Sequence, residues 1–109
     1  MSCQIFSGDT AGNALSTVKA IKYAADNGAV ILQCSWGYNS GMANSYEWGD
    51  PGFKTQEEWE KACPLEKEAL EYFIHNAGSP NGPIEGGLAI FAGGNENAPM
   101  AGFPGAADY

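Results

Sequence analysis

Residues Gly87 to Pro99 read Gly-Leu-Ala-Ile-Phe-Ala-Gly-Gly-Asn-Glu-Asn-Ala-Pro, and this stretch decides the fold. It begins with an uncharged apolar run, Leu88 to Ala92, which is typical of a strand covered on both faces. Gly93 and Gly94 follow, and because they lack a Cβ, the chain can turn sharply there and a ligand can approach its backbone. Asn95 then falls just beyond the carboxyl end of the strand, where open α/β sheets place their chemistry.

The residues alone leave two interpretations of Asn95 open. A neutral amide at this place suits a hydrogen-bond donor for an oxygen that becomes negative only during a reaction. The same residues also fit an ordinary polar turn that ends a strand.

The rest of the chain predicts helices and strands in alternation. The strands are expected over Ser2–Phe6 and Ala29–Cys34, and the helices over Ala14–Asn27, Thr55 to about Ala62, and Leu65–Asn76. Short turns between these segments are what βαβ units require. We therefore expect one α/β domain, a partial parallel sheet with helices packed on it.

The helices carry local signals of their own. Thr55 and Glu58 have the spacing of a capping box. In the last helix, the inner face is predicted to comprise Leu65, Ala69, Tyr72, Phe73 and Asn76. Solvent-exposed positions are predicted at Glu57, Glu58, Glu60, Glu66, Glu68 and Glu71. The stretch at about 38–63 contains aromatic side chains that we expect to form a small cluster rather than an exposed binding patch: Tyr46, Trp48, Phe53 and Trp59.

Composition excludes several classes of partner. The 109 residues carry a formal net charge of −8 and no basic patch, so neither nucleic acid nor an anionic membrane surface is an expected partner. No apolar run approaches the ~20 residues of a membrane span, and no leader-like segment follows Met1. The cysteines Cys3, Cys34 and Cys63 lack metal-site spacing and are expected to be free thiols. We expect no cofactor and no metal ligated by cysteine. Glu47 and Asp50 are carboxylates of the kind that bind calcium, but no D-x-D-x-D-G loop contains them, so calcium binding is left open.

Three segments together resemble a known family. Ala20-Ile21-Lys22-Tyr23-Ala24 runs into Asn27-Gly28-Ala29-Val30-Ile31-Leu32-Gln33-Cys34-Ser35-Trp36-Gly37, and Phe91-Ala92-Gly93-Gly94-Asn95-Glu96 and Phe103-Pro104-Gly105 follow. Their order and spacing resemble the subtilisin-like serine peptidases, with the motifs N-G-A-x-V-I-x-x-S-W-G, A-A-G-N-E and Y-P-G. The resemblance covers nearly all of residues 1–109, with a probable insertion at about 38–63. It implies an incomplete three-layer subtilisin-like fold.

The resemblance implies a role for each matched position. Asn95 would be the oxyanion-hole donor, and Phe103-Pro104 would be a cis peptide. One wall of the substrate pocket would be Ser35, Trp36 and Gly37, and the facing wall Ala92, Gly93 and Gly94, with Gly102 near the floor. The other backbone edge along the substrate would be Thr10, Ala11 and Gly12.

The catalytic motifs of the family, D-T/S-G, H-G-T and G-T-S-M-A, do not occur, and the single histidine, His75, lies within a predicted helix. The resemblance therefore implies an internal fragment of an exported peptidase that acts on peptides or proteins, inactive by itself because it lacks the catalytic Asp, His and Ser. A non-enzymatic peptide-binding module or pseudo-peptidase is the alternative. A nucleotide-binding loop at Gly93-Gly94 is disfavoured because Glu96 would repel phosphate. A fragment would also expose a sheet edge through which it could self-associate.

Overall fold

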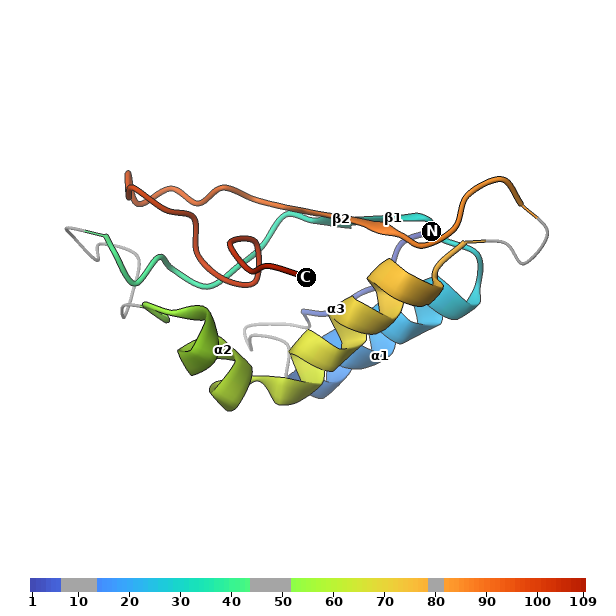
Figure 1. Cartoon of the computed structure of the whole chain (residues 1–109), viewed down its shortest axis with the longest axis horizontal. Helices are drawn as coiled ribbons and strands as arrows, with labels where there is room; N and C mark the ends of the chain where they lie inside the picture. Colours follow the sequence, from blue (N-terminus) through green and yellow to red (C-terminus); the bar gives the residue numbers. More distant parts are fainter. Residues whose placement is uncertain (7–13, 44–51, 79–81) are drawn as a thin grey trace. The chain divides into compact units, whose positions relative to one another are not determined.

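The computed structural model describes residues 1–6, 14–43, 52–78 and 82–109 (Figure 1). Its elements are α1 (Ala14–Asp26), β1 (Ile31–Cys34), α2 (Gln56–Ala62), α3 (Pro64–Asn76) and β2 (Leu88–Phe91). The two strands form one two-stranded sheet. The Leu88 N–H donates to the Val30 carbonyl at 2.9 Å, and the Ala92 N–H donates to the Cys34 carbonyl at 3.0 Å. The two residues of each bond are separated by the same number of positions along the chain, as they are when two strands run parallel. The predicted α/β class is confirmed.

The predicted strand at the start of the chain is wrong. Residues 1–6 are described and contain no strand. The Gln4 side-chain amide instead donates to the Phe6 carbonyl at 2.8 Å, a bond within the segment. A strand needs a neighbour that pairs with its N–H and C=O groups, and a short apolar pair such as Ile5-Phe6 does not supply one.

The chain divides into two compact units. Unit 1 comprises Met1–Leu32 and Leu65–Ala89, and unit 2 comprises Gln33–Pro64 and Ile90–Tyr109. In unit 1, α1 and α3 lie side by side, and the Tyr72 hydroxyl of α3 donates to Asp26 of α1 at 2.7 Å (Figure 1). Buried apolar side chains from both helices form its core: Ile21, Ala24, Ala25, Ala69, Leu70 and Phe73.

The inner face of α3 differs from the predicted one. Glu66, expected in solvent, is 2% exposed, whereas Leu65, expected in the core, is 54% exposed. The buried residues of α3 are Glu66, Ala69, Leu70 and Phe73, which follow the i, i+3, i+4, i+7 spacing of one helical face. The correct face was therefore present in the sequence, but one of its positions is a carboxylate.

Unit 2 is organised around Trp59 of α2, which is fully buried. Its ring stacks on Phe103 at 5.9 Å and meets Tyr109 edge-on at 6.4 Å. Gln56 accepts from the Asp108 N–H at 2.9 Å and donates to the Asp108 carbonyl at 3.1 Å, which fixes the C-terminal segment against α2. The predicted cluster does not include Phe103 and Tyr109, these two partners of Trp59, and its member Phe53 meets Tyr38 edge-on. Tyr46 and Trp48 lie outside the described residues, so a cluster of the four stays a prediction.

One face of the sheet is exposed. Ile31 and Leu88 are each 58% exposed and Ile90 is 40% exposed, and exposure alternates along both strands. The prediction that the strand at Leu88–Ala92 is covered on both faces is therefore wrong for the described chain. The uncharged run reflects an apolar second face, but nothing in the described chain buries it.

Candidate functional site

The candidate site lies at the carboxyl end of the strand pair, in unit 2. Residues 35–37 follow β1 and residues 92–95 follow β2. Because the strands are parallel and the Ala92 N–H still bonds the Cys34 carbonyl, the two segments leave the sheet at the same edge. The structure thus brings together the residues that the sequence predicted as facing walls: Ser35, Trp36, Gly37, Ala92, Gly93 and Gly94.

Asn95 is exposed at this edge. Its backbone N–H donates to the Glu96 carboxylate at 3.1 Å. Within the part of the chain that the structure describes, its side-chain amide makes no hydrogen bond and remains available to a ligand. Gly94 before it has φ +89°, a left-handed conformation that glycine adopts without strain, and a Cβ there would collide with the Glu96 carboxylate.

Trp36 is half-buried beside the sheet edge. Its ring meets Phe91 of β2 edge-on, with 5.7 Å between centroids and an interplanar angle of 90°. This contact joins the segment after β1 to the end of β2, so the two candidate walls are held by an aromatic pair as well as by the backbone ladder.

Gly102 is buried for a reason that the sequence did not reveal. A Cβ at this position would occupy the place of the Tyr38 backbone carbonyl, and the neighbouring Phe103 carbonyl accepts from the Tyr38 N–H at 2.8 Å. The glycine is therefore required by close backbone packing, and its role near a pocket floor stays a prediction. The Phe103-Pro104 peptide is cis, as the resemblance implies. Thr10, Ala11 and Gly12 lie outside the described residues.

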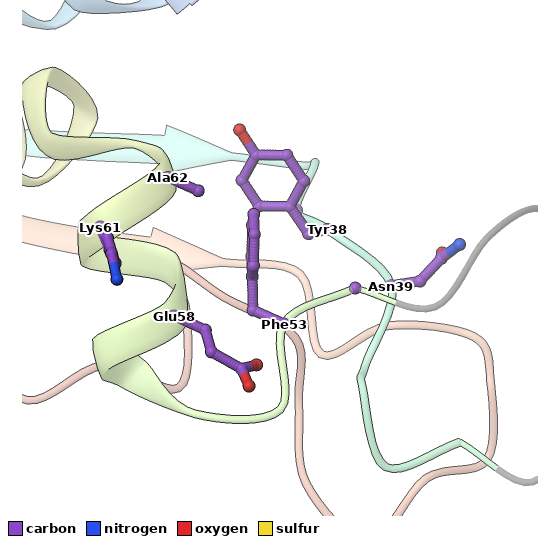
Figure 2. A pocket seen from close by; sticks show the side chains of 8 residues that line it. Tyr38, Asn39, Phe53, Glu58, Lys61 and Ala62 are labelled. Carbon is purple, nitrogen blue, oxygen red and sulfur yellow. The ribbon is translucent and has the colours of Figure 1, made fainter.

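A cavity of about 640 Å³ in unit 2 was missed by sequence reasoning (Figure 2). It lies between α2 and the segments at 37–39 and 52–53, and of the predicted site residues it includes Gly37 alone. The other side chains that line it are Tyr38, Asn39, Phe53, Glu58, Lys61 and Ala62. These side chains lie within residues 38–63, where the stretch before α2 has no periodicity to indicate which side chains converge.

Three titratable groups with clearly shifted pKa values, Lys22, Asp26 and Tyr72, lie in unit 1. The hydrogen bond from Lys22, followed by that from Tyr72, lowers the pKa of Asp26 below its usual 3.8. The hydrogen bond to Asp26 raises the pKa of Lys22 and that of Tyr72 above their usual values. The Lys22 ammonium also lies 4.8 Å from the centre of the Tyr72 ring. This network joins α1 to α3 and has no part in the candidate site.

The described residues contain neither a metal-binding cluster nor a membrane-spanning helix. No group of three or more His, Cys, Asp or Glu side chains among them is arranged to hold a metal ion. None of the helices they form is both long and apolar enough to cross a membrane. His75 is exposed in the last turn of α3.

Searches of protein-family models, curated proteins and solved structures found no match to this chain. The function of the site therefore has to be inferred from its own residues and their arrangement.

Proposed function

We propose that this chain is the part of a subtilisin-like serine peptidase domain that carries the oxyanion-hole donor and two walls of the substrate pocket. The observation that supports it most is the parallel strand pair, from which residues 35–37 and 92–95 leave at one edge with the Asn95 amide exposed. Preorganised neutral donors at such an edge stabilise negative charge as it develops in a transition state.

In this proposal, an extended peptide substrate pairs with the backbone of residues 35–37. Recognition by added strands uses exposed N–H and C=O groups, and Ser35 and Gly37 are exposed. Attack on the scissile carbonyl forms a tetrahedral oxyanion, and the Asn95 side-chain N–H donates to it. The attacking serine and its histidine base have no counterpart in the motifs of this chain and would come from other parts of the same domain.

The alternative is a peptide-binding module without catalysis. It is favoured by the absence of the motifs D-T/S-G, H-G-T and G-T-S-M-A from the 109 residues. The same walls would then bind an extended peptide, and the Asn95 amide would have no reaction to serve.

The test compares the 109-residue chain with the product of its whole reading frame. Both are treated with a fluorophosphonate, which labels activated serines, and assayed against a broad peptide library. We expect the whole product to be labelled at a serine in a G-T-S-M-A segment and to cleave peptides, and the 109-residue chain to do neither.

Two results contradict the proposal. A whole product without label, turnover or the three motifs would favour the binding module. Hydrolysis by the 109-residue chain that the fluorophosphonate abolishes would show that it holds a nucleophile of its own.

A further inference from the structure

Asn27 and Gly28 lie where α1 ends and the turn toward β1 begins. Both residues are exposed. Gly28 has φ +87°, and a Cβ built on it would have nothing within 4 Å. The turn therefore needs glycine for its left-handed backbone, while the space beside Gly28 stays open.

An asparagine followed by a glycine is a chemically labile pair. The backbone nitrogen of the glycine can attack the side-chain carbonyl carbon of the asparagine, because the glycine has no side chain to hinder the approach. The attack closes a five-membered ring. The sequence contains this pair at Asn27-Gly28 and at Asn81-Gly82, and Asn81 lies outside the described residues.

The last turn of α1 holds both reacting groups apart from each other. The Asn27 side-chain amide donates to the Tyr23 carbonyl at 2.8 Å. The Gly28 N–H donates to the Ala25 carbonyl at 3.4 Å, a length at the weak end of the hydrogen-bond range. The nitrogen that would attack is thus the less firmly held group, and helix ends open locally at little cost in free energy.

We propose that Asn27 is a modification site, at which the side-chain amide is lost through a succinimide formed with Gly28 when the last turn of α1 opens. The Gly28 nitrogen bonds to the side-chain carbonyl carbon of Asn27 and gives up its proton. The bond from that carbon to the amide nitrogen breaks, and ammonia leaves. Water then adds to either carbonyl of the ring and opens it, which gives aspartate or isoaspartate at position 27. The sum is one amide hydrolysed by one water, and no other reactant is needed.

The product would weaken the end of α1. A carboxylate has no N–H, so the hydrogen bond to the Tyr23 carbonyl is lost. The new negative charge lies at the C-terminus of the helix, where the macrodipole disfavours anions, and next to Asp26. Because Asp26 accepts from Tyr72 of α3, the modification acts at the junction of the two helices. This inference is independent of the proposed function.

The experiment incubates the 109-residue chain at neutral pH and body temperature, with and without denaturing urea. Digestion with pepsin in acid and tandem mass spectrometry then locate each asparagine that has gained the mass of an amide-to-acid change. We expect Asn27 to give two products of equal mass that separate by chromatography. The conversion should be about tenfold faster in urea, because the folded turn must first open.

Asn27→Gln is the matched control, because it keeps the amide but would have to close a six-membered ring. It should gain no acid at position 27, while Asn81 converts as in the parent chain. Asn27→Asp supplies the product directly and should lower the midpoint of thermal unfolding by about 5 °C. Asn97→Asp adds the same charge at an exposed position of unit 2 and should leave the midpoint near the parent value.

Each contrary outcome removes a defined part of the proposal. Absence of conversion at Asn27 in either condition, or conversion at Asn81 alone, would overturn the site. Equal rates with and without urea would overturn the control by the folded turn. An unchanged midpoint in Asn27→Asp would overturn the effect on the junction of α1 and α3.

Discussion

Three exposed side chains join the two long helices of unit 1. Asp26 accepts from Tyr72 at 2.7 Å and from Lys22 at 2.5 Å. Because these groups are exposed, solvent and salt screen the pair and its contribution to stability is small. The pKa shifts nevertheless fix the pH range in which the network exists.

The pH dependence follows from the direction of each shift. The lowered pKa of Asp26 means that its contribution is full above 3.8 and is lost as the pH falls through the lower folded-state value. The raised pKa values of Tyr72 and Lys22 mean that the contributions of these two groups to stability are full below about pH 10 and are lost as the pH rises further.

We expect Tyr72→Phe to raise the pKa of Asp26 toward 3.8, measured by ¹³C NMR titration. Tyr23→Phe is the control, and an unchanged Asp26 in Tyr72→Phe would contradict the assigned hydrogen bond.

Single residues of the candidate site were predictable where chain order alone determines their place. Asn95 follows an apolar run and two glycines, and any parallel strand there puts it at the sheet edge. The need for glycine at position 102 was not predictable in this way. A side chain there would collide with the backbone of Tyr38, which lies 64 residues earlier in the chain. No local pattern encodes such a contact.

At the scale of elements, the start of α2 shows how a local signal is realised. The Thr55 hydroxyl accepts from the Glu58 N–H at 3.2 Å, as the predicted capping box requires. Glu58 reaches back one residue further than expected and accepts from the Lys54 N–H at 2.8 Å. The cap orders the start of the helix that carries Trp59.

We expect Thr55→Ala to lower the free energy of unfolding by about 1 kcal/mol, the usual cost of removing an N-cap side chain. Thr55→Ser keeps the hydroxyl and should retain most of the stability. Chemical denaturation followed by Trp fluorescence measures both, and equal stability of Thr55→Ala and the parent chain would show that the cap is not needed.

Helix existence was predictable, but the details that depend on tertiary contacts were not. Residues 14–26, 56–62 and 64–76 are helical as their caps and periodicity indicate. The burial of Glu66 could not be foreseen, because a carboxylate on an apolar face looks like a break in the pattern. The strand predicted within the first six residues does not form. Strand formation depends on a pairing neighbour, and the sequence of the segment itself does not specify one.

At the scale of the whole molecule, the exposed apolar face of the sheet and the outer sides of its strands favour association between copies of the chain. Ile31, Leu88 and Ile90 present apolar side chains to solvent. Among the residues that the structure describes, the sheet has two strands, so the outer side of each strand has no further strand beside it. Under the proposed function, the rest of the peptidase domain would cover both. For the chain alone, we expect association between copies.

Sedimentation velocity at micromolar concentration should therefore show dimers or larger species. Ile31→Lys places a charge on the exposed face and should shift the population toward monomer, whereas Tyr23→Lys, an exposed position on α1, should not. A parent chain that is strictly monomeric would contradict this prediction.

The central claim is that the Asn95 side chain donates to an oxygen that becomes negative only in the transition state. It is tested most directly by kcat of the whole reading-frame product with Asn95→Ala, beside Asn97→Gly, which removes a nearby amide at φ +51°, a conformation that glycine tolerates. We predict that kcat falls about 10²–10³-fold in Asn95→Ala, a magnitude carried over from the corresponding donor of subtilisin, and stays near the parent value in Asn97→Gly. An active enzyme whose kcat is unchanged by Asn95→Ala would contradict the claim.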